Sequence, residues 1–314
     1  MYYSDKISSL ERIFGSESLI VESGRIIINK DTILPIVNDV IIAMPDSVGS
    51  KAKDIQDGFG DEWGEFSAML PEYNNEFQDY FDIVDLQGLK GKTVCDLGCG
   101  VGRWSYFMKD IAQEIVLVDF SDAIFEARDN LRGNNNMIYI KADVRCLPFR
   151  DNFADFIMCL GVLHHLPEDA LFILRGLRKY APVSLIYLYY ALDNRPFYFK
   201  VIFWFIDALR NCVSKIKSHR IKMVLAFLFT VFIYKPLIMF GDIMHFLRMP
   251  ANNIPLYGAY RNKSFRRIMQ DAYDRFFTSI EQRFSRNNIL CLKDSYTDII
   301  ISDKQPYWHF LCVR

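Results

Sequence analysis

Between residues 91 and 192, short apolar runs alternate with longer segments whose apolar positions recur every three or four residues. The short runs predict buried strands, and the longer amphipathic segments predict helices. We expect strands at 93–97, 114–119, 137–141, 154–160 and 183–191, and helices at 102–110, 121–132 and 167–180. Ser121 is predicted to be the N-cap of the second helix. This order predicts a parallel sheet covered by helices on both faces.

The alternation stops at Leu192 and resumes near the end of the chain. There the pattern predicts a helix at 285–292 and strands at 297–302 and 308–313. The sheet domain should therefore consist of residues 91–192 and 285–314. Residues 193–284 have a different composition and are predicted to be a helical cap, inserted after the fifth strand of the sheet.

The N-terminal third has its own pattern. Apolar runs within the first 45 residues are separated by polar turns, and they predict a small β-rich appendage over residues 1–57. The small, polar and charged residues 45–58 are interpreted as a linker. From residue 59 to residue 84 the apolar spacing is helical, and we expect Pro71 to break this stretch into two helices. We expect residues 58–90 to form a helical lid.

The composition is that of a globular chain. Of 314 residues, 51% are hydrophobic and 24% are charged, which excludes a disordered protein. The formal net charge of −1 gives no general basic field, so nucleic acid is not expected as a partner. The seven cysteines include no C-x-x-C pair, and we expect neither a disulfide framework nor a metal. This cysteine usage fits a reducing cytoplasm best, and no signal peptide is predicted.

The predicted cap differs from the rest of the chain in charge. Between Arg195 and Met249, nine Lys or Arg residues face two Asp residues, so this segment is about +7 in a chain of −1. The apolar run at 223–234 has 12 residues without a charge, whereas a membrane span needs about 20. Apolar helices with basic borders suit contact of residues 196–247 with an anionic membrane surface, peripheral on the inner face. A buried lid, a homodimer surface and a true span are the alternatives.

A glycine-rich loop, VCDLGCGVGRW at 94–104, follows the first strand of the alternation. Glycines there allow a tight turn and close approach of a ligand to the backbone. The dinucleotide fingerprint G-x-G-x-x-G is not met, because Arg103 stands in place of the third glycine. Asp96, just before the loop, would repel a pyrophosphate and suits a ligand with a cationic amino end.

Two further carboxylates follow the next two strands. Asp119 ends the second strand, 23 residues after Asp96, where an acidic residue can accept both hydroxyls of a ribose. Asp143 follows the third strand, where a carboxylate could accept the exocyclic amine of an adenine. The expected ligand is an adenine–ribose with a positively charged, phosphate-free tail, which describes S-adenosylmethionine better than NAD or ATP.

Four segments in order resemble the class I S-adenosylmethionine-dependent methyltransferases: DLGCGVG at 96–102, VLVDFS at 116–121, KADVRCLPF at 141–149 and FADFIMCLGVLHHLPE at 153–168. The resemblance implies an α/β, Rossmann-like sheet of seven strands with one antiparallel edge strand, the strand at 308–313. It also implies that the chain is an enzyme and that S-adenosyl-L-methionine is its cofactor.

The resemblance assigns cofactor-binding residues by the part of the cofactor they would contact. These are Asp96, Gly98, Cys99 and Gly100 for the methionine end, Asp119 for the ribose, Asp143 and Val144 for the adenine, and the backbone at Leu160 for the methyl sulfonium. Trp63, Trp104 and Phe120 are candidates for aromatic walls beside the sulfonium, through cation–π attraction. Core packing is the alternative role for each of these rings.

His164 and His165 are the candidate catalytic residues. They follow the fourth strand, at the carboxyl edge where open α/β sheets bind ligands. A histidine that is neutral near pH 7 suits a general base. The alternative is that the pair only shapes the loop. The charged and aromatic segment 271–286 could line an acceptor pocket, or it could be a solvated surface helix.

The element FGDEWGEF at 59–66 resembles a lid found in a subset of these enzymes that act on sugars, lipids and secondary metabolites. With the apolar cap, it favours a hydrophobic or membrane-associated small-molecule acceptor: a lipid-linked glycan, a quinone precursor or a lipophilic metabolite. One alternative is a small polar acceptor, with the apolar cap as a dimer surface. Another is a non-catalytic S-adenosylmethionine-binding protein.

Overall fold

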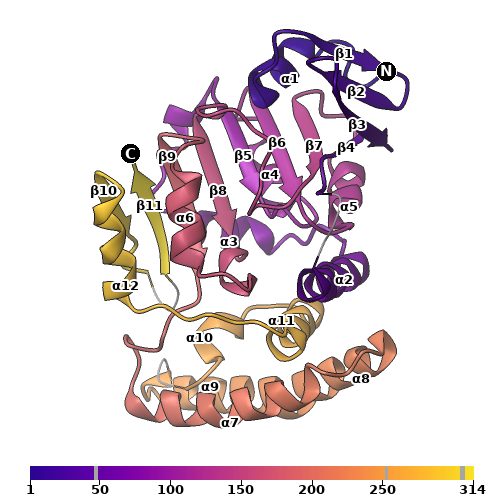
Figure 1. Ribbon diagram of the computed structural model, residues 1–314. Coiled ribbons are helices and arrows are strands. Elements are labelled where there is room, and N and C mark those ends of the chain that lie inside the picture. The colour runs from indigo at the N-terminus through magenta and orange to yellow at the C-terminus, as the bar shows by residue number, and fades with distance from the viewer. Residues whose placement is uncertain (46–48, 252–253, 305–307) are drawn as a thin grey trace. The chain divides into compact units, whose positions relative to one another are not determined.

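The computed structural model describes residues 1–45, 49–251, 254–304 and 308–314 (Figure 1). The chain divides into two compact units. The first unit comprises Met1–Ala191 and Glu281–Arg314, and the second comprises Leu192–Ile280. The second unit is therefore an insertion in the sequence of the first.

The first unit is built on a mixed sheet whose central strands are parallel (Figure 1). The strands follow the order β7-β6-β5-β8-β9-β11-β10, and β11 runs antiparallel to both of its neighbours. Their bounds are Thr93–Leu97 (β5), Glu114–Asp119 (β6), Met137–Lys141 (β7), Phe156–Leu160 (β8), Val183–Leu188 (β9), Asp298–Ile301 (β10) and Trp308–Val313 (β11). The predicted α/β class is confirmed. The reversed strand β11 lies one place inside the edge, which β10 forms.

The N-terminal strands continue this sheet beyond the seven predicted strands, so the predicted count is not exact. Helix α1 (Ile7–Phe14) precedes four antiparallel strands, β1 (Leu19–Glu22), β2 (Arg25–Ile28), β3 (Thr32–Val37) and β4 (Val40–Ile42). Strand β4 pairs in parallel with β7, which gives one sheet of eleven strands among the described residues. The physical reason is that β7 would otherwise present an unpaired edge, and β4 satisfies its backbone groups.

Five short helices accompany the sheet in the described part of the first unit, besides α1: α3 (Tyr73–Tyr80), α4 (Arg103–Met108), α5 (Ala123–Asn130), α6 (Ala170–Leu177) and α12 (Arg286–Leu290). The longer helix α2 (Ser50–Glu65) contacts loops at the carboxyl ends of the strands. Short 3₁₀ turns complete the unit: η1 (Gln87–Leu89), η2 (Leu163–His165) and η5 (Cys291–Asp294). Alternate residues of the buried strands belong to two separate apolar clusters, one on each face of the sheet. This is the packing that a parallel sheet between two helical layers requires.

Two local predictions are corrected. Helix α2 begins at Ser50, inside the stretch that we interpreted as a linker, because its polar residues and three glycines hide the helical period. Helix α5 begins at Ala123 rather than after a Ser121 cap. The Ser121 hydroxyl instead donates to a carboxylate oxygen of Asp119, 2.7 Å away, and is held at the end of β6.

Within its described part, the second unit contains helices joined by turns and loops, and no strand. It contains α7 (Phe197–Val213), α8 (His219–Phe229), the π-helical turn η3 (Thr230–Tyr234), α9 (Lys235–Phe246), α10 (Tyr257–Tyr260) and α11 (Phe265–Phe277). Segments α8, η3 and α9 form one continuous helix of 28 residues, His219–Phe246. By length and composition alone, this helix could cross a membrane.

Candidate methyl-donor and acceptor site

The glycine loop joins β5 to α4 through three residues with left-handed backbone. Gly98, Gly100 and Gly102 have φ values of 74°, 53° and 78°, a region that L side chains rarely adopt. The amides of Gly98 and Cys99 both donate to the carbonyl of Val118, at 2.7 and 3.0 Å. A Cβ atom on Gly98 would overlap the side chain of Val162. The loop is therefore held tightly between β6 and the turn that follows β8.

Asp119 closes this loop from the neighbouring strand. One carboxylate oxygen accepts the Gly100 amide at 2.8 Å, and the other accepts the backbone amide of Ser121, at 2.8 Å, and its hydroxyl. Burial raises the pKa of Asp119 above its ordinary value, while these hydrogen bonds oppose the rise. By lone-pair count, the oxygen that accepts the Gly100 amide has room for a further donor. The carboxylate therefore lies at the end of β6, next to the glycine loop, as predicted for a ribose ligand.

Asp96 is a buried carboxylate at the other side of the loop. It is 1% exposed, and Ser105 on α4 donates to it at 2.7 Å. Burial raises its pKa to about 7, and the nearby charge of Asp119 adds to the rise. A cation placed beside Asp96 would stabilise its ionised form. The site therefore favours a ligand with a positive charge at this point.

Asp143 is already paired in the structure. The guanidinium of Arg145 contacts both carboxylate oxygens, at 2.6 to 3.0 Å, and also reaches Glu168 at 3.0 Å. These charges raise the pKa of Arg145. Sequence reasoning missed this pair, although the two residues are only two positions apart. Asp143 and the adjacent, half-buried Val144 lie just beyond the carboxyl end of β7.

Helix α2 contacts three loops at the carboxyl ends of the strands. The Gln56 side-chain amide donates to the carbonyl of Phe120 at 2.7 Å. The Phe59 ring lies 5.3 Å from the ring of His165. A Cβ atom on Gly100 would approach the Trp63 ring to 3.2 Å. The structure thus brings Trp63 to the glycine loop, and Gln56 is a contact that sequence reasoning missed.

Arg103, the first residue of α4, occupies the place of the third fingerprint glycine. Its guanidinium lies over the rings of Trp63 and Trp104, 5.1 and 4.5 Å from their centres. Trp104 itself is buried in the core between the sheet and its helices. This burial favours the core-packing role for Trp104. Cys99 is also buried, and burial holds the pKa of its thiol well above the ordinary value.

The two candidate catalytic histidines lie in η2, immediately after β8. Leu160 ends that strand and is buried, and Gly161 follows with a φ of 83°. His164 and His165 have ring centres 4.1 Å apart, and both are almost fully buried. His164 stacks on Tyr189 at 4.0 Å, and neither of its ring nitrogens has a hydrogen-bond partner among the described residues. Burial, with the charges of His165 and Arg283, holds the pKa of His164 well below its ordinary range.

The segment that returns to the sheet packs directly against these histidines. Gln282 donates its backbone amide to the carbonyl of His164 at 2.8 Å, and its side chain bonds the backbone at Leu166 and Glu168. Arg283 lies over the Tyr189 ring at 5.5 Å and pairs with Glu281. The end of segment 271–286 thus lies beside the candidate catalytic pair. Tyr189 and Gln282 are contacts that sequence reasoning did not single out.

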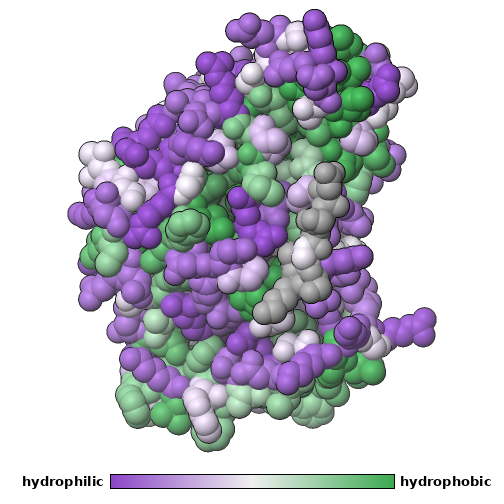
Figure 2. All heavy atoms as spheres, viewed as in Figure 1, coloured by the Kyte–Doolittle hydropathy of each residue, from purple (hydrophilic) through white to green (hydrophobic). Residues whose placement is uncertain are grey.

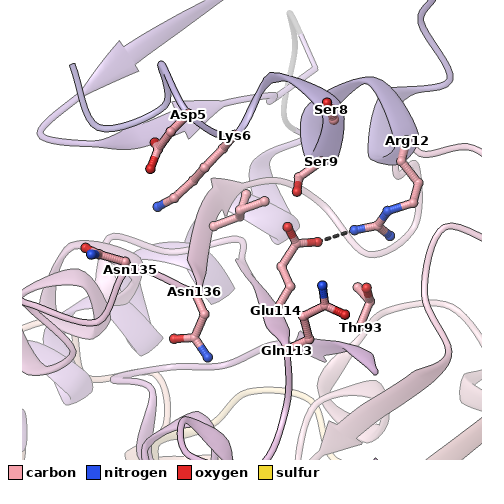
Figure 3. A pocket seen from close by; sticks show the side chains of 11 residues that line it. Asp5, Lys6, Ser8, Ser9, Arg12, Thr93, Gln113, Glu114, Asn135 and Asn136 are labelled. Carbon is pink, nitrogen blue, oxygen red and sulfur yellow. Dashed lines mark hydrogen bonds and ion pairs between the residues drawn. The ribbon is translucent and has the colours of Figure 1, made fainter. Parts of the chain in front are cut away.

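A polar cavity of about 610 Å³ lies at the opposite, amino end of the same strands (Figure 3). Figure 3 shows Arg12 pointing to Glu114, the first residue of β6, from helix α1. Arg12 also donates to the carbonyl of Phe153, and Lys6 donates to that of Met137 at 3.0 Å. The cations of this cavity are therefore used to hold the N-terminal segment against the sheet.

Comparison with known proteins gives the class of the domain. Residues 94–180 match a family described as a methyltransferase domain. A ubiquinone biosynthesis O-methyltransferase of Nitrosomonas europaea is 34% identical over 104 residues, which are 32% of this chain and 44% of that protein. Phosphoethanolamine N-methyltransferase 1 of Triticum aestivum is 28% identical over 124 residues, 38% of this chain and 21% of that protein. The chain thus spans less than half the length of these relatives.

Among solved structures, magnesium protoporphyrin IX methyltransferase from Synechocystis, with bound S-adenosylmethionine, is also similar. Its TM-score is 0.37 and its identity 22%, over 47% of this chain and 80% of that one. The family match and the strand order identify the class: this chain carries a class I S-adenosylmethionine-dependent methyltransferase domain. At the level of this domain, the match confirms the predicted methyltransferase class and its cofactor.

The residues of this chain also fit that cofactor. Three glycines with left-handed backbone carry no side chain that would keep a ligand from the loop, and the buried Asp96 accepts a hydrogen bond from the neutral Ser105 hydroxyl. Asp119 accepts the Gly100 amide, and the Trp63 ring lies close to Gly100. Asp96 would hold the amino group of the methionine end, and Asp119 would hold the ribose.

Proposed function

We propose that this protein transfers the methyl group of S-adenosylmethionine to a hydrophobic, membrane-associated small molecule, with an aromatic quinone precursor as the preferred acceptor. The observation that carries the acceptor class is the ring cluster after β8 and β9, formed by Phe59, His164, His165, Tyr187 and Tyr189. Flat rings with polar edges suit an aromatic acceptor that bears hydroxyl groups. The relative from ubiquinone biosynthesis supports the same class.

The reaction needs little covalent help from the protein. The bound cofactor supplies a methyl group on a sulfonium, and transfer forms the acceptor–methyl bond as the sulfur–methyl bond breaks. Positioning and exclusion of water then provide most of the rate. The glycine loop, Asp96 and Asp119 would hold the donor, and the ring cluster would orient the acceptor.

The two histidines would have different roles at the acceptor, one as the general base and the other in positioning that base. His165, beside Phe59 of the lid helix, would accept the proton that an acceptor hydroxyl loses on methylation. His164 would position it, because its ring is stacked between His165 and Tyr189 and stays neutral. The proposed location is the cytoplasm, with the protein held peripherally at the inner face of the membrane where such acceptors are dissolved.

A non-catalytic S-adenosylmethionine-binding protein is the second candidate. The observation that favours it is the burial of both histidine rings, which leaves them 0% and 3% exposed. A base must come within hydrogen-bond reach of the proton it accepts. Under this alternative the ring cluster is simply part of the core.

Radiolabelled S-adenosylmethionine separates the candidates. The protein is incubated with the labelled donor and with either a membrane-lipid extract, a demethylated quinone precursor or a deproteinised aqueous extract. Label in the organic phase, dependent on the protein and lost in Asp119→Ala, is the expected result. Label only in the aqueous phase would replace the proposed acceptor with a small polar one. Donor binding without transfer to any extract would favour the non-catalytic protein.

A further inference from the structure

Helix α7 exposes an unusually large apolar face. Its exposed side chains include Phe197, Val201, Trp204, Phe205 and Leu209. Spacings of three and four residues place them along one side of the helix. Exposed single apolar residues are ordinary, but a continuous row of this length marks a contact surface.

The long helix His219–Phe246 carries a second row. Its exposed side chains include Ile221, Val224, Leu228, Phe232, Met239, Ile243 and Phe246. At 1.5 Å per residue, its 28 residues extend over about 40 Å. Figure 2 shows hydrophobic side chains gathered over α7 to α9. Of the 25 large exposed apolar side chains among the described residues, 19 belong to the second unit, so the apolar surface is concentrated there.

The charge of this unit identifies the kind of surface that it suits. Residues 192–280 contain fourteen Lys or Arg and five Asp, a formal charge of +9 in a chain of −1. Exposed Lys215, Lys217 and Arg220 lie in and next to the turn between α7 and α8, at the ends of both apolar rows. A second copy would bring an equal positive charge against them. An anionic lipid surface attracts them instead, and it accepts apolar side chains between its headgroups.

The buried side of the helix His219–Phe246 indicates its orientation relative to a bilayer. Its buried row includes Ala226, Thr230 and Tyr234, and helix α11 packs along α8 and η3. Helix α11 carries the ion pair of Arg267 with Asp271, whose charges do not belong in hydrocarbon. A transmembrane position of the long helix would take α11 into the bilayer with it. The packing therefore favours a helix that lies in the plane of the interface.

We propose that the second unit is a membrane-docking unit whose α7 and His219–Phe246 helices lie flat in the headgroup region of an anionic bilayer. The apolar rows enter the boundary between headgroups and acyl chains, and the basic side chains of Lys215, Lys217 and Arg220 contact lipid phosphates. This inference rests on the proposed function only in one respect, namely that the membrane would be where the acceptor is dissolved. Docking itself requires neither donor nor acceptor, so it can fail or succeed independently.

The primary experiment is flotation of the full chain with vesicles of phosphatidylcholine alone or mixed with phosphatidylserine. We expect binding to the mixed vesicles at low salt, at least tenfold weaker at 500 mM salt. Depth is measured with Phe232→Trp in a Trp204→Phe background and lipids brominated at known positions. Strongest quenching by shallow bromines is expected. Quenching by bromines at the bilayer centre would replace the proposal with a span, and absence of flotation at low salt would overturn it.

Matched variants test the surface itself. Phe205→Asp with Phe232→Asp should lower vesicle binding at least tenfold, whereas Phe172→Asp on α6 should not, although Phe172 and Phe232 are 71% and 72% exposed. All variants should keep their circular dichroism and their affinity for S-adenosylhomocysteine. Equal binding by the double variant would overturn the assignment. A lipid-free dimer of the wild type that the double variant abolishes would assign the surface to a second copy instead.

Discussion

Charged side chains at the two ends of the central strands in the first unit differ in how fully they are paired within the chain. At the amino end, Arg12 pairs with Glu114, and Lys6 donates to the carbonyl of Met137 while burial lowers its pKa to about 8. At the carboxyl end, the buried Asp96 accepts a hydrogen bond from Ser105, and burial raises its pKa to about 7 although the nearby charge of Arg103 opposes the rise. Charges that are paired within the chain stabilise the fold, whereas a buried carboxylate whose burial is only partly compensated indicates a place for a cationic ligand.

Cavity volume alone would place the site at the amino end of the strands, away from the glycine loop. The polar cavity at the amino end is large, but its cations already have partners in the chain. The carboxyl end has the left-handed glycines, the unbalanced carboxylate and the ring cluster. The side chains and backbone conformation at the carboxyl end, rather than the volume of a cavity, therefore identify the candidate site. The cavity at the amino end lies where the N-terminal segment packs against the sheet.

The largest effect is expected for the candidate base. His165→Ala should lower kcat about a hundredfold, the lower range for general base catalysis, with the affinity for S-adenosylhomocysteine unchanged. His164→Ala should act less on kcat, because its ring stacks on Tyr189 and positions its neighbour. Single-turnover rates with the labelled donor measure both. Wild-type rates in both variants would mean that positioning alone carries the reaction.

Asp119→Ala should weaken S-adenosylhomocysteine binding at least tenfold. It removes charge-assisted hydrogen bonds to the ribose, each worth about 1.5–3 kcal/mol. Titration calorimetry gives the dissociation constant, and Glu114→Ala, at the amino end of the same strand, is the matched control. Equal losses in the two variants would show that the strand's stability, and not a ribose contact, is being measured. Micromolar binding of NAD to the wild type would overturn the choice of cofactor.

The sequence predicted the parts of this site that depend on strand ends. Asp96, Asp119 and the histidines lie at the carboxyl edge because the apolar runs before them form parallel strands, and that edge follows from the β/α alternation. Trp63 was also predicted, and it does lie against Gly100. These positions depend on local patterns within about thirty residues.

The missed contacts depend on distant segments or on a weak local pattern. Gln282 reaches the carbonyl of His164 across more than 100 residues, after the whole second unit has intervened. Strand β4 joins β7 although almost 100 residues separate them. Helix α2 was only half predicted, since its glycines weaken the apolar period. Residue spacing in a single sequence does not predict such contacts. The pairing of a strand with a distant strand is decided by which side chains pack together in the folded chain.

The pH dependence of binding tests the charge at Asp96. Its ionised form would attract the ligand's amino group, so affinity for S-adenosylhomocysteine should rise about tenfold between pH 6 and pH 8 and level off above pH 7. Asp96→Asn should bind more weakly at pH 8 and show no such rise. A wild-type affinity that does not change with pH would remove the cation-binding role.

The same residue predicts an opposite trend for stability. Because its folded pKa lies above its unfolded value, the folded state binds more protons, and the free energy of unfolding should fall as the pH rises from about 4 to about 7. Asp96→Asn keeps the Ser105 hydrogen bond without the charge. In thermal unfolding without ligand, it should therefore be more stable than the wild type at pH 8, by a margin that narrows towards pH 4. A variant less stable at both pH values would contradict the raised pKa.

The smallest effect is expected at the lid. Gln56→Ala removes the hydrogen bond from α2 to the carbonyl of Phe120, worth about 1 kcal/mol, or roughly a fivefold loss of donor affinity if α2 must be ordered for binding. Gln113→Ala, a neutral amide that lines the cavity at the amino end, is the matched control and should leave affinity unchanged. Calorimetry at pH 8, where Asp96 is ionised, gives the largest signal. A Gln56→Ala variant with wild-type affinity would mean that α2 covers the glycine loop without contributing to donor binding, so that only Asp96, Asp119 and the loop distinguish the carboxyl end.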